Sequence, residues 1–310
     1  MAWVAFAIAA AALASRFMPV TNHTVLILAA LSPYLMTLAG LSALLFSLTR
    51  RRWSVLAALV LTALAVVVEL PMFIGPDPIP ANTVEVRVLT ANLYEGAADP
   101  KALVAIARNR ADLVVVEELT PDLAKSLAGE GINADFPYST ADARPFAAGV
   151  GIWSRYPVVG SSQVTGYELG VVSAVIQIPD TARNTMVLAA HLVGPWPQPI
   201  DGWRQELATF PDTLHALATA AGQGALIVAG DFNATFDMRP FRRLLQTGFR
   251  DAAEQSGAGL TPTYSAESAL PPDIGIDHVL TLRSSATDVH TVRIPGSDHL
   301  GLIASVHVPR

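Results

Sequence analysis

The chain has 310 residues, of which 52% are hydrophobic and 15% are charged, and its mean hydropathy is +0.42. This composition is too apolar for an ordinary soluble domain, and a formal charge of −6 disfavours a protein that binds nucleic acid through a basic surface. Because the chain contains no cysteine, disulfides, thiolate chemistry and Cys-ligated metals are excluded.

The apolar excess is concentrated in the first 75 residues, which carry few charges. About 20 predominantly apolar residues span a bilayer, so two long uncharged runs predict transmembrane helices at about 24–49 and 53–74. The two runs abut, which favours membrane spans over buried core helices. A third helix is expected at about 2–20, because no basic residue precedes its apolar run as a signal peptide would require. The formal charges of this segment are Arg16, Arg50, Arg51, Arg52 and Glu69.

The three arginines at 50–52 lie between the two long runs and predict the orientation of the chain. Positive residues in short loops stay cytoplasmic, so the helix that follows would exit outward. We therefore expect a multi-pass cell-membrane protein with its anchor at 1–75 and the rest of the chain on the extracytoplasmic side. The Pro-rich stretch 76–82 is typical of a short, stiff linker. Residues 83–310 are long enough for one sizeable domain, and the 16 basic and 25 acidic residues after residue 75 give it a net charge of −9.

Strands outnumber helices in the pattern after residue 83. Several strands are apolar on both faces, which favours an α/β fold with two packed β-sheets flanked by helices, a four-layer α/β sandwich. Helical spacing is found at 98–110, 120–130, 202–220 and 237–248. Strands are expected at 84–93, 111–119, 149–158, 171–178, 184–193, 225–233, 274–282 and 301–308.

Several of these apolar strands end in a side chain that can bind a metal ion or a phosphate. The run "IVAGDFNAT" presents Asp231 and Asn233, which in an extended chain point to the same side. The pair could serve a metal, a water nucleophile or an oxyanion, or it could form an ordinary Asx turn. Because α/β sites assemble at strand ends along one edge of a sheet, the whole series predicts a site. Its other members are Asn92, Glu118, His191, Asp277, Asp298 and His299.

These residues lie in an ordered set of short motifs: "NL", "EEL", "HL", "GDFN", "IDH" and "SDH". The set resembles the endonuclease/exonuclease/phosphatase superfamily, which includes DNase I-like nucleases, inositol polyphosphate 5-phosphatases and neutral sphingomyelinases. The segment "GVGIWSRYPV" is similar to that family's Gly-x-x-x-Ser-(Arg/Lys)-x-Pro segment. The resemblance covers about 84–308, which is nearly the whole part of the chain beyond the linker.

The resemblance implies a role for each motif residue. Glu118 matches the principal Mg²⁺-binding glutamate and Asn92 the asparagine beside it, while Asp298 matches a carboxylate that binds or supports metal. The family's usual Gln-Glu pair is Glu117-Glu118 here, so Glu117 is a substitution at a position that is not a ligand. The implied catalytic residues are Asp231 and Asn233, which orient the water and contact the phosphate, His299 with its partner Asp277, and His191, which contacts the scissile phosphate.

The chemistry of phosphoryl hydrolysis agrees with these roles. The reaction needs a hard cation and hydrogen-bond donors on the phosphate oxygens, and Mg²⁺, with Mn²⁺ as the alternative, prefers oxygen ligands. The sequence leaves open whether Asp231 or His299 deprotonates the water. We expect His278 to be structural, because it should face away from its neighbour in the strand. Trp196 and Trp203 could meet a substrate or the membrane surface, or could pack the loop that contains them.

Three functions are compatible with these features. The first is a membrane-anchored phosphohydrolase that acts on a membrane lipid or lipid-linked phosphate, which the anchor would hold at high effective concentration. Its layout resembles small bacterial members of the VanJ-like subgroup, which are associated with glycopeptide resistance. The second, an extracytoplasmic nuclease, is disfavoured by the acidic balance and by the lack of a basic stripe with interleaved aromatics. The third, a catalytically inactive binding module, is disfavoured by the complete set of motif residues.

Overall fold

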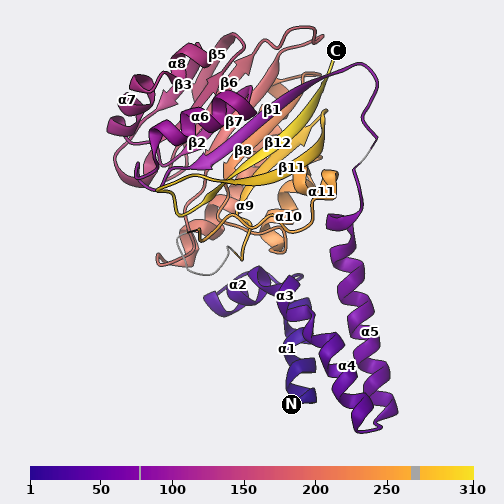
Figure 1. Ribbon diagram of the computed structural model, residues 1–310. Helices are drawn as coiled ribbons and strands as arrows, with labels where there is room; N and C mark the ends of the chain where they lie inside the picture. Colours follow the sequence, from indigo (N-terminus) through magenta and orange to yellow (C-terminus); the bar gives the residue numbers. More distant parts are fainter. Residues whose placement is uncertain (77, 267–272) are drawn as a thin grey trace.

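The structure is a computed structural model that describes residues 1–76, 78–266 and 273–310. Figure 1 shows a group of N-terminal helices on one side of a domain that contains two β-sheets. The predicted linker at 76–82 includes residue 77, which lies outside the described residues. Its described part from 78 to 82 forms no helix or strand.

The N-terminal segment contains five α-helices and one 3₁₀-helix among the described residues. The expected helix at 24–49 is not continuous, because α2 meets the α3–α4 pair at an angle of 68°. Pro33 lacks the N–H that would continue the hydrogen bonding of α2, so that helix stops just before it. The carbonyl of Ala29 accepts a hydrogen bond from the Ser32 hydroxyl instead, at 2.9 Å. The elements are α1 (Ala2–Ser15), α2 (His23–Ala30), α3 (Ser32–Met36), α4 (Leu38–Leu48), α5 (Arg52–Glu69) and η1 (Leu70–Phe73).

By length and composition, one helix in the described part of the chain can cross a membrane, Arg52–Phe73. The bent pair His23–Ala30 and Ser32–Leu48 would be a second candidate if it counts as one span, and Ala2–Ser15 is apolar but shorter. Small residues let α1, α4 and α5 approach closely, with Ala9 and Ala39 fully buried where the helices meet. Since these spans are candidates by length and composition, the membrane anchor stays a prediction.

The two sheets confirm the predicted α/β sandwich. The first has the strand order β11-β12-β1-β2-β4-β3 and the second β5-β6-β7-β8-β10-β9. Each is mixed, because β1 and β2 pair in parallel, as do β7 and β8, while the other pairs are antiparallel. The strands are β1 (Thr83–Asn92), β2 (Leu113–Glu117), β3 (Tyr138–Asp142), β4 (Val150–Ser154), β5 (Val158–Gln163), β6 (Val171–Ile176), β7 (Thr185–His191), β8 (Leu226–Asp231), β9 (Arg250–Asp251), β10 (Asp277–Leu282), β11 (Ser285–Arg293) and β12 (Leu300–Pro309).

The core is divided into layers that match the two faces of each sheet. Val86, Val115 and Ile227 belong to the fully buried cluster between the sheets. A second cluster buries the outer face of the first sheet under α6 (Pro100–Arg110), α7 (Pro121–Gly129) and α8 (Ile132–Asp135). The outer face of the second sheet is covered by α9 (Ile200–Ala220) and α10 (Arg239–Leu245), while the short α11 (Ala252–Ser256) follows β9.

The N-terminal segment contributes to this last layer. Val20, Leu26 and Ala29 are 2%, 6% and 0% exposed, and they belong to the same apolar cluster as α9 and α10. The helix α2 therefore packs on the two-sheet domain. This contact brings α2 to the edge of the sheets where the polar strand ends gather.

Candidate active site

The topology explains why polar residues from distant parts of the sequence meet at one edge. The carboxyl ends of the parallel strands β7 and β8 lie together, and β10 begins there because it runs antiparallel to β8. The register places Asp231 directly opposite His191 on one side and Asp277 on the other. In the first sheet, β1 and β2 end together and β12 starts beside them. All eight predicted site residues lie at this edge.

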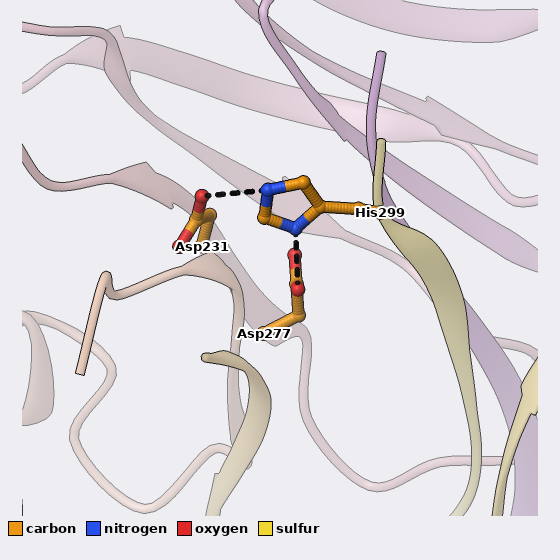
Figure 2. A group of neighbouring side chains, drawn as sticks. All are labelled: Asp231, Asp277 and His299. Carbon is orange, nitrogen blue, oxygen red and sulfur yellow. Dashed lines mark hydrogen bonds and ion pairs between the residues drawn. The ribbon is translucent and has the colours of Figure 1, made fainter. Parts of the chain in front are cut away.

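His299 and Asp277 form a buried pair, drawn in Figure 2. The Nδ1 atom of His299 donates to Oδ2 of Asp277 at 2.8 Å, and its Nε2 atom lies 3.8 Å from Oδ2 of Asp231. Burial opposes the charged form of His299, but the carboxylates of Asp277, Asp231 and Asp298 outweigh burial and raise its pKa to about 10. The imidazole is thus a cation at neutral pH, and its Nε2–H points into the site.

Asp231 uses its two carboxylate oxygens differently. Its Oδ1 accepts a hydrogen bond from the backbone N–H of Asn233 at 2.8 Å, which is an Asx turn, while its Oδ2 faces the histidines. The "GDFN" stretch therefore forms the Asx turn and leaves the second oxygen of Asp231 facing the histidines. Gly230 precedes it because a Cβ there would lie 1.9 Å from the carbonyl oxygen of Ala190 in β7. Burial first, and then the charge of Asp277, raise the pKa of Asp231 to about 7.

Glu118 and Asn92 connect the two sheets. Glu118 follows β2 with a φ of 57°, and its Oε2 accepts the N–H of Glu95 at 2.6 Å. The Nδ2 of Asn92 donates to Oε1 of Glu118 at 3.0 Å and to Oδ2 of Asp231 at 3.1 Å. Its Oδ1 accepts the N–H of Tyr94 at 2.9 Å. Asn92 thus presents its amide nitrogen to the carboxylates, and direct metal ligation through its oxygen would require the amide to rotate.

His191 and Asn233 complete the ring of side chains. The Nδ1 of His191 donates to the carbonyl of Ala147 at 3.0 Å, which leaves Nε2 facing the site, 3.7 Å from Oδ2 of Asp231 and 4.0 Å from Oε1 of Glu118. Burial lowers the pKa of His191. Asn233 has a φ of 49° and donates through Nδ2 to the carbonyl of Leu192 at 2.9 Å, which holds the loop after β8 against the end of β7.

Of these side chains, those of Glu118, His191, Asp231, Asn233 and His299 line a cavity of about 410 Å³. Among its described lining residues there are five carboxylates and two histidines but no lysine or arginine. An anionic phosphate would be repelled by such a lining unless a cation is also bound. The donor set of carboxylate oxygens fits a hard divalent cation. The charged and titratable lining residues are Glu95, Glu118, Glu168, His191, Asp231, Asp298 and His299.

Two groups of residues could hold the metal. Ligand atoms of Asp231, Asp277 and His299 all lie within 4.8 Å of one another. However, His299 and Asp277 are already hydrogen-bonded to each other, so their facing atoms are not free for an ion. Glu118, Asp231 and Asp298 line the cavity, whereas Asp277 does not. The side of the cavity formed by Glu118 is therefore the better metal position.

Several residues that shape the site were not among the site residues predicted from the sequence. Glu117 is fully buried beneath it, accepts a hydrogen bond from the Thr90 hydroxyl at 2.8 Å, and has its pKa raised well above the usual range by burial. The ring of Tyr264 lies 4.9 Å from that of His299. Leu26, Ile27 and Ala30 of α2 form an apolar wall. In the sequence, Glu117 could be noticed because it belongs to the "EEL" motif. The α2 residues could not, because they are ordinary members of an apolar run.

The structure also places the histidine that was expected to be structural and the two tryptophans for which the sequence left a structural or a functional role open. His278 is buried and bonded at both nitrogens, to Asp251 at 2.8 Å and to the carbonyl of Ala234 at 2.9 Å, so it is structural as expected. Trp203 is fully buried and donates through Nε1 to the carbonyl of Asn233 at 2.9 Å, which supports the loop after β8. Trp196 is 67% exposed at the rim of the cavity.

Comparisons with known proteins agree with this fold. Residues 89–299 match the model of the Endonuclease/Exonuclease/phosphatase family. An endonuclease/exonuclease/phosphatase from Bacteroides vulgatus has 17% identity and a TM-score of 0.56, covering 73% of this chain and 99% of that one. A 3′ phosphatase from Neisseria bound to a product DNA hairpin has 18% identity and a TM-score of 0.55, covering 71% and 98%.

A third solved structure, D. rerio TDP2 complexed with single strand DNA product, has 15% identity and a TM-score of 0.56, covering 72% of this chain and 98% of that one. At these identities the likeness shows a shared fold. The comparison with curated proteins found no match.

Proposed function

The chain belongs to the endonuclease/exonuclease/phosphatase family, and we propose that it is a divalent-metal-dependent phosphoester hydrolase. The carboxylate-lined cavity that contains His299 carries this proposal. A bound Mg²⁺ or Mn²⁺, held by Glu118 with support from Asp298, would neutralise charge on the phosphate oxygens.

The chain's own side chains would perform the proton chemistry. Asp277 keeps the imidazole of His299 cationic, so its Nε2–H is suited to donate to a phosphate oxygen. Asp231 can hold or accept a proton of the attacking water through Oδ2, because its Oδ1 is engaged in the turn that fixes its orientation. With a pKa of about 7 in the metal-free site, Asp231 is balanced between its two protonation states near neutral pH.

We further propose that the substrate is a membrane lipid or a lipid-linked phosphate, with the catalytic domain on the extracytoplasmic side of the cell membrane. The apolar wall of the cavity supports this, since Leu26, Ile27 and Ala30 belong to the hydrophobic N-terminal segment. Ile27 and Trp196 are 51% and 67% exposed, so the wall leads outward from the site. A hydrocarbon chain attached to the phosphate would cover these side chains. The layout also resembles the VanJ-like subgroup.

A nuclease is the second candidate, because two proteins of similar fold were solved with DNA products. The net charge of −9 beyond residue 75 and the lack of a lysine or arginine in the described cavity lining oppose it. A catalytically inactive module would not need the His299–Asp277 pair to be assembled around a carboxylate-lined cavity.

The test is hydrolysis by the full chain in detergent with Mg²⁺, using a polyprenyl diphosphate, sphingomyelin and DNA as separate substrates. We expect turnover of a lipid phosphate that needs the metal and falls by orders of magnitude in Glu118→Gln and His299→Ala. His290→Ala is the matched control, because His290 is on β11 and does not line the cavity. Preferred cleavage of DNA would support the nuclease, and no turnover of any substrate would support the inactive module.

A further inference from the structure

We propose that Arg204, Arg239 and Arg243 form a second site, which binds the headgroup phosphate of an acidic phospholipid beside the N-terminal helices. These arginines line a cavity of about 380 Å³ on the outer side of α9 and α10. Its other walls include Pro19 and Val20, which follow α1. None of the three arginines lines the catalytic cavity. The inference rests on the proposed membrane location but not on the proposed hydrolysis.

The charge in this cavity is poorly balanced by the protein. Arg239 and Arg243 are four residues apart on α10, so they share a face of the helix and repel each other. Among the described lining residues, the acidic one is Asp201, whose exposed pair with Arg204 has an N–O distance of 3.1 Å. In the described part of the chain, no carboxylate forms an ion pair with Arg239 or Arg243. A local excess of cations in a domain of net charge −9 points to an anionic ligand.

The chemistry of the residues that line this cavity favours a phosphate group as the ligand. The guanidinium group is planar and matches phosphate oxygens with two parallel hydrogen bonds. Three arginines line this one cavity, and its walls are partly apolar because Val20, Leu207 and Pro240 also line it. A ligand with both a phosphate and a hydrocarbon part fits these walls better than a free phosphate ion does.

The cavity lies near the ends of the apolar helices α1 and α5, where the headgroups of a surrounding bilayer would be. Arg16, near the end of α1, is bonded to Glu69 at the end of α5, with an N–O distance of 2.6 Å, so these two helix ends lie at one level. Arg242 of α10 donates to the backbone carbonyl of Arg16, so α10 lies beside the ends of α1 and α5. Phe17 and Met18, which precede the lining residues Pro19 and Val20 in the chain, are 59% and 48% exposed, as expected for side chains at a bilayer surface.

The experiment uses the full chain in detergent and measures lipid retention by native mass spectrometry. The probes are phosphatidylglycerol, phosphatidylcholine and inorganic phosphate. We expect retention of phosphatidylglycerol over phosphatidylcholine, and a loss of affinity of roughly fivefold for each arginine removed, or about 25-fold in Arg239→Gln/Arg243→Gln. The matched control is Arg110→Gln/Arg183→Gln, which removes two exposed charges that line neither cavity.

Equal retention by the two double variants would overturn the proposal, as would equal retention of the neutral lipid. Retention of inorganic phosphate as strong as that of phosphatidylglycerol would also overturn it, because the site would then bind free anions. Hydrolysis of a soluble phosphoester should be the same in Arg239→Gln/Arg243→Gln and wild type. A wild-type chain that retains the acidic lipid through these arginines but hydrolyses nothing would contradict the proposed hydrolase and leave this site intact.

Discussion

At the scale of single residues, Asp231 shows how one side chain can serve both local structure and chemistry. One carboxylate oxygen closes the turn with Asn233, and the other lies 3.8 Å from Nε2 of His299 and 3.7 Å from Nε2 of His191. The turn therefore positions the second oxygen without using it. An exchange that preserves the turn but removes the basic oxygen separates these two roles.

Asp231→Asn is that exchange. Asparagine accepts the same N–H of Asn233, but its amide nitrogen replaces the oxygen that would bind the water proton. We expect kcat to fall by about 100-fold or more, the scale of a lost general base. The melting temperature of the metal-free protein should change little or rise slightly, because a buried carboxylate near Asp277 is removed. An unchanged kcat beside an Asp201→Asn control would mean that Asp231 forms a turn and nothing more.

The protonation of His299 depends on Asp277. In Asp277→Asn the amide oxygen can still accept from Nδ1, but the negative charge is gone, so the pKa of His299 should fall well below 10. Since the folded pKa exceeds the unfolded value of about 6.5, protonation of His299 stabilises the wild-type fold below that value, and this contribution is lost as pH rises through about 10.

NMR titration of the His299 ring in the metal-free protein measures this shift. The control is Asp288→Asn, which removes the carboxylate partner of the exposed His290 and should leave the His299 titration where it is. A midpoint that is the same in Asp277→Asn and wild type would show that Asp277 only orients the ring.

At the scale of elements, the sequence predicted the strands that end at the site far better than the helix that covers it. The strands ending at Asn92, His191 and Asp231 are apolar runs that stop at a polar residue, and this pattern survives in the fold. The helix α2 was hidden in an uncharged run from 24 to 49, where a break at Leu31 changes neither hydropathy nor length. Packing against α9 and α10 determines its direction, and this depends on contacts remote in sequence.

The same limit applies to the geometry inside the site. The sequence placed Asn92 next to Glu118, but it could not show that the amide nitrogen would bridge Glu118 and Asp231. That contact joins β1 of one sheet to β8 of the other, and it depends on how the two sheets are packed. The strands that end at the site residues could be predicted from the motifs, whereas the contacts across the sandwich could not.

The exposed face of α2 provides a test of the lipid-linked substrate. Ile27→Ser removes an apolar side chain from the cavity wall, which should weaken binding of a long-chain phosphate by roughly 1 kcal/mol, or about fivefold in KM. A short-chain analogue should be hydrolysed as well as by wild type. Leu59→Ser on α5 is the control, since Leu59 is 53% exposed and does not line the cavity. Equal effects on both chain lengths would exclude α2 as a wall for the hydrocarbon.

At the scale of the whole molecule, the proposed orientation depends on the arginines at 50–52 between α4 and α5. With that loop in the cytoplasm, a single crossing by Arg52–Phe73 puts the two-sheet domain outside. A reporter that is active only in the cytoplasm, fused after Arg310, should therefore be inactive. A fusion after Arg51 is the control and should be active. Strong activity after Arg310 would reverse the topology.

The N-terminal helices and the catalytic domain are also joined by buried charges. Arg16 is 2% exposed and pairs with Glu69 of the N-terminal segment and with Asp237 of the loop that follows Asn233. The backbone carbonyl of Asp237 accepts in turn from Arg242 at 2.5 Å. A cation from the N-terminal segment thus holds the loop that leads out of the active site, so a change at Arg16 should affect both stability and catalysis.

Arg16→Met is the test of this coupling. The variant keeps much of the side-chain volume but leaves Glu69 and Asp237 buried without their cation, which should cost about 3–5 kcal/mol. We expect a lower melting temperature in detergent, faster protease cleavage near the linker and a lower kcat. The control, Lys125→Met, removes a cation from a fully solvated pair with Asp122 and should change none of these measurements. If Arg16→Met matches this control, the two parts of the chain are not held together by the buried charges, and α2 would have to be kept at the site by its apolar contacts alone.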